Sequence, residues 1–363
     1  MPLRKWKEIQ KMLCPIVDAN KPDALIIGQA GEIIRRGGLV AFPTETVYGL
    51  GADALNEEAV ARIYKAKGRP TDNPLIWHIN DVGELEKITQ LTTKTSSVIE
   101  RLAKAFWPGP MTLVLNCKYE INGATVNTIG KRSTIAVRVP SHPVARALIA
   151  ASERIIAAPS ANISGKPSPT QAHHVLEDFS SSNDVEMVLD GGATQSGLES
   201  TVLDLHQDGE ITLLRPGAIT REMLMDVIGN VSEFLGSTEG TPLAPGMKYR
   251  HYAPIAPLIL ITGYPEAVAR EIYKRSREIT SQKVGILATT QTLHVYDSLP
   301  ESSIFVLGNR KRPESMAQDL FGCLRNFDYL GVDIIFAEGV DEDGIGTAIM
   351  NRLKKAAAEE IKV

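Results

Sequence analysis

Short apolar runs alternate with amphipathic helical segments from about residue 23 onward, and this alternation limits the possible folds more than any other feature. Residues 23–36 place apolar side chains at helical spacing, and residues 39–42 follow as a short apolar strand. Asn56 is a suitable N-cap for the next helix, NEEAVARIYKAK, which ends at Gly68. Further strand-length runs occur at 75–79, 111–116, 134–139, 155–158, 185–189, 201–205 and 211–214, and helical patterns occur at 81–90, 95–106 and 142–152. This order predicts an α/β domain with a twisted, mixed sheet and flanking helices.

The pattern changes at residues 229–256, which are rich in glycine and proline and show no sustained periodicity. From residue 257 a second alternation of apolar runs and helices begins, which predicts a smaller, Rossmann-like parallel α/β domain. No GxGxxG follows its first strand, so a dinucleotide site is unsupported there. We therefore expect a first domain over 23–228, a linker over 229–256 and a second domain over 257–363.

The charge balance and the cysteines exclude several classes of protein. The chain has 39 Lys and Arg residues against 43 Asp and Glu residues, whereas domains that bind nucleic-acid phosphates usually carry a basic excess. No run approaches the roughly 20 apolar residues of a membrane span, and we see no signal peptide, so a cytoplasmic location is expected. Three widely spaced cysteines (Cys14, Cys117 and Cys323) form neither a disulfide framework nor a zinc motif.

The segment FPTETVYGLGADA (42–54) places Thr44, Glu45 and Thr46 where the first apolar strand ends. Ligands of α/β sheets bind outside the carboxyl ends of strands, so these side chains occupy a favourable place for a site. The alternative is a plain strand exit with threonines that face solvent.

A second polar segment, KAKGRPTDNPLIWHI (65–79), brings two cations together beside a turn. Lys67 and Arg69 flank Gly68 at a helix end, and Asn73 and His78 follow closely. A guanidinium and an ammonium suit a phosphate group. Favourable charge at a helix C-terminus explains the two cations equally well, and a single strand histidine is more often structural than catalytic.

The third segment, AAPSANISGKPSPT (157–170), is the strongest candidate. Ser160, Asn162 and Ser168 crowd a loop that offers hydroxyl and backbone N–H groups to an anion, although the loop lacks the Walker A spacing. A flexible linker is the alternative, but long polar loops between regular elements tend to be functional. Arg138 and Arg215 lie on apolar strands, where a cation needs a partner or a ligand. These residue types alone indicate nucleotide or phosphate handling and no more.

Taken in order, the motifs PTETVYGLG, KGR, DNPL with His78, SAN, GKPSPT, LEST and LRPG resemble the YrdC-type threonylcarbamoyl-AMP synthases. The segment PGMKYRHYAP (245–254) resembles the linker of the longer, two-domain members. The resemblance implies a YrdC-like catalytic first domain. It also implies a nucleotidyltransferase that makes threonylcarbamoyl-AMP and pyrophosphate from L-threonine, bicarbonate and ATP. That adenylate would serve threonylcarbamoyl modification of the adenosine next to the anticodon in tRNAs that read ANN codons.

The resemblance also implies roles for individual residues. Lys67, Arg69, Ser160 and Asn162 would be catalytic. L-threonine would be held by Thr46, His78, Arg138 and Ser200, with Thr44 close by. ATP would be held by Lys67, Arg69, Asn73, Thr134, Ser160, Asn162, Ser168 and Arg215, with Ala158 contributing backbone only. Tyr249 and His251 in the linker would act as a lid that excludes water from the adenylate.

Mg²⁺ is expected to arrive with ATP, and no protein ligand for a metal is identified. A downstream tRNA threonylcarbamoyl-transferase complex is the expected partner, no membrane is expected, and direct tRNA binding is left open. Two alternatives remain. One is a carbamoyl-adenylate-forming domain like those of hydrogenase maturation proteins, although those chains carry zinc-finger segments. The other is an RNA-binding or ribosome-associated module without turnover, against which the acidic balance argues.

Overall fold

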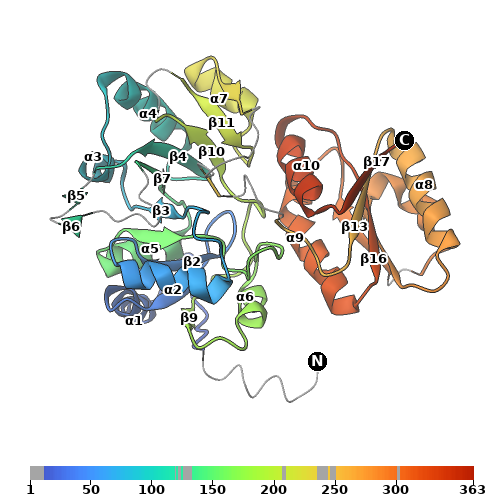
Figure 1. Cartoon of the computed structure of the whole chain (residues 1–363), viewed down its shortest axis with the longest axis horizontal. Helices are drawn as coiled ribbons and strands as arrows, with labels where there is room; N and C mark the ends of the chain where they lie inside the picture. The colour runs from blue at the N-terminus through green and yellow to red at the C-terminus, as the bar shows by residue number, and fades with distance from the viewer. Residues whose placement is uncertain are drawn as a thin grey trace. The chain divides into compact units, whose positions relative to one another are not determined.

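The computed structural model divides the chain into two units, each of which is described by itself (Figure 1). The first unit comprises residues 1–164, 169–195 and 199–248, and the second comprises 165–168, 196–198 and 249–363. The residues that the structure describes are 12–118, 120–121, 124–125, 133–206, 210–234, 244–245, 251–300 and 303–363.

A ten-stranded sheet forms the centre of the first unit, in the order β12-β11-β10-β4-β7-β3-β8-β2-β1-β9. Its strands are β1 (Leu39–Phe42), β2 (Gly49–Asp53), β3 (Ile76–His78), β4 (Met111–Asn116), β7 (Thr134–Arg138), β8 (Ile156–Ala158), β9 (Val185–Val188), β10 (Thr201–Asp204), β11 (Thr212–Arg215) and β12 (Ser232–Glu233). Parallel pairs such as β3 with β7 alternate with antiparallel pairs such as β4 with β7, so the predicted mixed sheet is confirmed. A separate two-stranded ribbon pairs β5 (Glu120–Ile121) with β6 (Ala124–Thr125).

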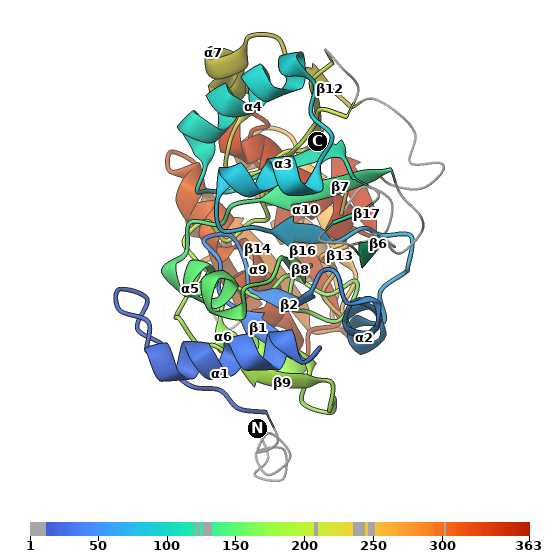
Figure 2. The same cartoon turned by 90° about the vertical axis from the view of Figure 1, so that its left-hand side faces the viewer.

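Helices cover the two faces of this sheet unequally. Leu39 and Ala41 of β1 pack in one apolar cluster, whereas Val40 and Phe42 pack in another, as expected for side chains that alternate across a strand. The first cluster includes residues of α2 (Glu57–Lys67), α3 (Leu85–Ile88), α4 (Thr93–Phe106), α6 (Ala172–Asp178) and α7 (Arg221–Ile228). The second includes residues of α1 (Ala24–Arg35) and α5 (Pro143–Ser152), which lie over β1, β8 and β9. Figure 2 shows β1, β2, β8 and β7 in this order from α1 upward.

A third, small cluster continues the α1–α5 side of the sheet over β3, β7, β4, β10 and β11. It consists of Ile76, Val114, Ala136, Val202, Leu214 and Ala244. Among the described residues, Ala244 of the linker is its one member outside the sheet. Within the described residues of the first unit, this part of the sheet therefore packs against Ala244, and His78, Arg138 and Arg215 lie on the same face.

The strand β2 is not among the strands that the sequence predicts. Residues 49–53 pair antiparallel with both β1 and β8. A Cβ atom on Gly51 would lie 2.8 Å from Ile156 and 2.8 Å from the ring of Phe42. Glycine is thus required by close packing inside the sheet and not by a turn.

The second unit contains a five-stranded sheet in the order β15-β14-β16-β13-β17, with all its pairs parallel. The strands are β13 (Leu258–Thr262), β14 (Val284–Thr289), β15 (Ile304–Gly308), β16 (Ile334–Glu338) and β17 (Glu359–Lys362). The helical elements are α8 (Pro265–Glu278), η4 (Thr290–Tyr296), α9 (Pro313–Leu330) and α10 (Gly344–Ala356). The predicted Rossmann-like parallel domain is confirmed, and β17 is an additional edge strand. Across the described residues, the helices lack the combination of length and apolar character that a bilayer crossing demands.

Candidate active site

Lys67, the last residue of α2, is a buried cation that contacts the loop after β8. The ammonium of Lys67 donates hydrogen bonds to the backbone carbonyls of Ser160 and Asn162, and Lys67 is 1% exposed. The Ser160 hydroxyl donates to Oδ1 of Asn162 over 2.5 Å. Gly68 closes the helix in the left-handed conformation, with φ of 59°. This arrangement holds together an ammonium, a hydroxyl and an amide, the groups of Lys67, Ser160 and Asn162, to which the resemblance assigns catalytic roles.

The turn after α2 forms a second polar cluster around Arg69. Its guanidinium donates to the carbonyls of Asn73 (3.1 Å) and Pro74 (2.8 Å), and the Tyr64 hydroxyl also donates to the Asn73 carbonyl. The amide group of Asn73 is buried, and neither its nitrogen nor its oxygen has a hydrogen-bond partner within the described residues. A buried amide without a partner is unfavourable, so this group is suited to a bound ligand.

The loop between β1 and β2 meets the end of β7. Nη1 of Arg138 donates to the Thr46 hydroxyl over 3.0 Å, and Nε donates to the Gly109 carbonyl over 3.2 Å. Thr44 and Thr46 are joined by a 2.8 Å hydrogen bond between their hydroxyls. Nη2 of Arg138 also lies 2.8 Å from a carboxylate oxygen of Glu45, and both side chains are buried. The structure therefore brings the predicted residues Thr44, Thr46 and Arg138 together.

His78 ends β3 and is held as a neutral imidazole. Burial, with the charge of Arg138 adding to it, lowers the pKa of His78 to about 3. Its Nδ1 lies 3.1 Å from the Ile76 carbonyl, a contact that assigns the proton to Nδ1. Nε2 is then a hydrogen-bond acceptor, which suits a hydroxyl or amine of a ligand.

Ser200 and Arg215 form the opposite end of the site. The Ser200 hydroxyl accepts a hydrogen bond from Nη2 of Arg215 (3.2 Å) and lies 2.7 Å from the Thr112 hydroxyl. Nη1 of Arg215 donates to the carbonyl of Pro245 over 3.2 Å. The linker residue beside Ala244 thus contacts a predicted ATP-binding side chain within the first unit.

Strand register places these groups in a row across the sheet. His78 pairs with Arg138 between β3 and β7, and Leu113 pairs with Val137 between β7 and β4. The residue before Leu113, Thr112, pairs with Val202 of β10, which in turn pairs with Arg215 of β11. His78, Arg138 and Arg215 therefore lie in one row on neighbouring strands, on the same face of the sheet.

The remaining predicted residues are placed as follows. Thr134 begins β7 two residues before Ala136, on the same face, and Ala158 ends β8 opposite Ile76. Ser168 and His251 are described in the second unit, where Ser168 is buried and the His251 ring lies 5.6 Å from that of Tyr252. Tyr249 lies outside the described residues.

Sequence reasoning missed two residues that contact the site. Glu45 was noticed only as part of the threonine-rich segment, and Thr112 has no local signal because it occurs within the apolar run 111–116. The ion pair of Glu45 with Arg138 and the contact of Thr112 with Ser200 join positions that are distant in the chain.

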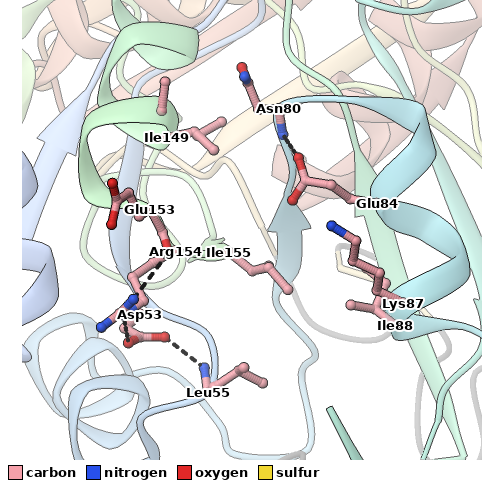
Figure 3. A pocket seen from close by; sticks show the side chains of 11 residues that line it. Asp53, Leu55, Asn80, Glu84, Lys87, Ile88, Ile149, Glu153, Arg154 and Ile155 are labelled. Carbon is pink, nitrogen blue, oxygen red and sulfur yellow. Dashed lines mark hydrogen bonds and ion pairs between the residues drawn. The ribbon is translucent and has the colours of Figure 1, made fainter. Parts of the chain in front are cut away.

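A pocket of about 520 Å³ lies elsewhere in the first unit (Figure 3). Arg154 pairs with Asp53 over 3.2 Å there, and Glu84 accepts from the backbone of Asn80. None of the predicted site residues lines this pocket. Within the described residues, no group of three or more His, Cys, Asp or Glu side chains could hold a metal ion.

Both parts of the chain match known protein families. Residues 32–217 match the Sua5–YciO–YrdC family, described as telomere recombination, and residues 219–358 match the threonylcarbamoyl-AMP synthase C-terminal domain. The threonylcarbamoyl-AMP synthase of Pyrococcus abyssi is 48% identical over 337 residues, which cover 92% of this chain and 94% of that protein. The threonylcarbamoyl-AMP synthase of Bacillus subtilis is 46% identical, with the same coverage.

A solved structure extends the similarity to three dimensions. The crystal structure of P. abyssi Sua5 complexed with L-threonine matches with a TM-score of 0.86 and 45% identity, covering 97% of this chain and 100% of that one. The resemblance seen in the motifs is therefore confirmed over nearly the whole length. The chain belongs to the threonylcarbamoyl-AMP synthase family, whose members are nucleotidyltransferases, in its two-domain form.

Proposed function

We propose that this chain converts L-threonine, bicarbonate and ATP into threonylcarbamoyl-AMP, pyrophosphate and water. The observation that carries the proposal is the row of His78, Arg138 and Arg215 across one sheet face, in the same unit as the buried Lys67 and the unpartnered Asn73 amide. The name of the P. abyssi relative and its complex with L-threonine support the substrates.

The product would be consumed by a tRNA threonylcarbamoyl-transferase complex. That complex would modify the adenosine next to the anticodon in tRNAs that read ANN codons, in the cytoplasm. Direct tRNA binding by this chain is not part of the proposal.

The amino-acid half of the site would be formed by Thr46, His78, Arg138 and Ser200, with Thr44 beside them. A guanidinium binds a carboxylate through parallel N–H donors, so Arg138 suits the α-carboxylate of threonine. The neutral imidazole of His78 can accept a hydrogen bond through Nε2, and the hydroxyls of Thr46 and Ser200 can bond to the threonine hydroxyl.

The nucleotide half would be formed by cations and amides. It comprises Lys67, Arg69, Asn73, Thr134, Ser160, Asn162, Ser168 and Arg215, with the backbone of Ala158. In the reaction, the threonine nitrogen attacks CO₂ derived from bicarbonate and loses a proton, which gives a carbamate. A carbamate oxygen then attacks the α-phosphorus, and the bond to the bridging oxygen breaks to release pyrophosphate. Lys67 and Arg69 would stabilise the charge on the phosphoryl oxygens.

Mg²⁺ would come with ATP, since it is usually bound through phosphates and water with few protein ligands, and it would neutralise phosphate charge.

The linker over 229–256 is proposed as a lid between a catalytic domain over 23–228 and a domain over 257–363. Its described part supports this role, because Ala244 is fully buried against Ile76, Val114 and Val202, and Pro245 accepts from Arg215. Further along the linker, Tyr249 and His251 would complete the cover over the filled site. Excluding water would protect the adenylate from hydrolysis.

Pyrophosphate release from ATP by the purified protein tests the proposal, with threonine and bicarbonate each omitted in turn. Release should require both, and Lys67→Ala should reduce it by at least a hundredfold. Lys65→Ala is the matched control, because Lys65 lies on the same helix with its side chain 76% exposed. Its activity should stay within twofold of the unaltered protein.

Two outcomes would contradict the proposal. Release that does not depend on threonine would mean that another acceptor is used. No release from a folded protein, together with salt-sensitive RNA binding, would favour the RNA-binding alternative.

A further inference from the structure

Glu45 is a buried carboxylate to which the proposed reaction assigns no role. It lies between Thr44 and Thr46 and is 4% exposed. Burying a carboxylate is unfavourable unless a cation compensates its charge. Arg138 is that cation, since its Nη2 lies 2.8 Å from Oε1 of Glu45. This is the one ion pair that either side chain forms among the residues the structure describes.

The loop that carries Glu45 is fixed by its own hydroxyl groups. The Thr44 hydroxyl donates to the Val47 carbonyl over 2.6 Å and accepts from the backbone N–H groups of Thr46 and Val47. The Thr46 hydroxyl lies 2.8 Å from that of Thr44 and accepts a hydrogen bond from Nη1 of Arg138. The Glu45 side chain is therefore presented to Arg138 by a backbone that has little freedom to move.

The guanidinium of Arg138 is held on three sides. Nε donates to Gly109, Nη1 donates to Thr46, and Nη2 contacts Glu45. Hydrogen bonds from Nε and Nη1 use two of the five guanidinium N–H groups, and the described contact of the buried Nη2 is the ion pair with Glu45. We infer that Glu45 is a positioning residue, whose carboxylate fixes the orientation of Arg138 so that its guanidinium receives the α-carboxylate of the amino-acid substrate. This inference rests on the proposed function.

The charges around the pair favour this role over a role as a base. Burial opposes ionisation of Glu45, but the adjacent Arg138 outweighs it, and the pKa of Glu45 lies below its ordinary value. His78 has a pKa of about 3, and burial also lowers the pKa of His142, which lies close enough to feel the charge of Glu45. At neutral pH, Glu45 is thus ionised beside neutral imidazoles, and a carboxylate held in this form is a poor proton acceptor.

Calorimetric titration with L-threonine alone tests the inference without requiring turnover. Glu45→Gln keeps the shape of the side chain and removes its charge, and it should weaken threonine binding by at least tenfold. Arg138→Gln should weaken it at least as much. The double variant should bind no more weakly than Arg138→Gln alone, because Glu45 acts only through Arg138. Arg138→Lys replaces Arg138→Gln if the latter does not fold.

Kinetics and a control separate positioning from a general structural effect. Glu45→Gln should raise the KM for threonine while kcat and the KM for ATP stay within twofold. Glu186→Gln removes another paired carboxylate, which contacts Arg36 and Arg62 outside the site. Its threonine affinity should stay within twofold of the unaltered protein.

Several results would overturn the inference. Unchanged or tighter threonine binding in Glu45→Gln would mean that the ion pair does not support the substrate. A further loss in the double variant would mean that Glu45 touches threonine itself. An equal loss of ATP binding, with a lower Tm, would indicate a structural role. If the unaltered protein does not bind threonine at all, the proposed function fails together with the inference.

Discussion

His78 and Arg138 occupy directly paired positions on the parallel strands β3 and β7. A cation beside an imidazole disfavours a second positive charge, and burial acts in the same direction. The pair therefore combines a permanent cation with a histidine that stays neutral well below physiological pH.

Because His78 is neutral in the folded protein, the free energy of unfolding should depend on pH. The unfolded chain protonates His78 near pH 6.5, whereas the folded chain does so only at about 3. Between these values the unfolded state binds more protons, so the free energy of unfolding should fall as the pH drops. From pH 7 to 5 the loss due to His78 is about 2 kcal/mol. Urea unfolding of His78→Gln at both pH values should show a smaller loss, whereas the exposed control His294→Gln should behave like the unaltered protein.

Because the side-chain amide of Asn73 has no hydrogen-bond partner within the described residues, its loss should have a large effect on ligand binding and a small effect on stability. Asn73→Ala should reduce ATP-dependent pyrophosphate release by at least tenfold, because the ligand loses its hydrogen bonds. The free energy of unfolding without ATP should change by no more than about 1 kcal/mol, since no hydrogen bond within the protein is lost. Asn116→Ala provides the comparison, because its amide donates to the His206 carbonyl over 2.8 Å. That variant should lose stability and keep its ATP dependence.

The packing of Gly51 against Phe42 and Ile156 predicts a steric effect. Gly51→Ala should lower the free energy of unfolding by about 1–3 kcal/mol, because the new methyl group has no space. Gly28→Ala is the matched substitution, since Gly28 lies in α1 and its new methyl group would meet no neighbouring atom within 4 Å, and it should raise stability by about 0.5–1 kcal/mol. Equal effects in denaturant titrations would contradict the assignment of residues 49–53 to a packed strand.

In the second unit, substitution of Glu338 should lower the free energy of unfolding. Activity assays should not detect this loss directly. Its carboxylate accepts hydrogen bonds from the hydroxyls of Thr289, Thr292 and Tyr296, and Arg310 lies 3.5 Å away. Glu338→Gln retains the shape but loses the charge, and it should cost about 2–3 kcal/mol. Tyr296→Phe removes a single hydrogen bond and should cost about 1 kcal/mol. If thermal unfolding shows equal costs, the carboxylate is not the centre of this network.

The sequence predicted those elements in which periodicity and local capping agree. Strands β1 and β4 have their predicted bounds, and α2 begins after Asn56 and ends at Gly68 as expected. Residues 81–90 instead form a 3₁₀ turn (Val82–Glu84), which begins with a capping box between Asp81 and Glu84, followed by the four-residue α3. The strand β2 was missed because its glycines serve packing, which local patterns do not reveal.

The polar side chains that the sequence singled out at strand ends lie close together in the structure, but their partners were not predicted. Residue type and position indicated Arg138 and Ser200, but the contacts with Glu45 and Thr112 depend on which strands become neighbours. The contact of Pro245 with Arg215 depends likewise on the path of the linker. Such pairings are set by tertiary packing and have no signature in a local stretch of sequence.

The polar side chains of the candidate site come from the neighbouring strands β3, β7, β4, β10 and β11. The site therefore forms only if each of these strands pairs in the correct register. Side chains alternate between the two faces of a sheet, so a slip of one residue in any of these strands would turn its polar group into the helix-covered core. Helix and strand content would hardly change after such a slip. If the proposed function holds, heat-treated or refolded samples of this protein should lose threonine binding while their circular dichroism still resembles that of the native form.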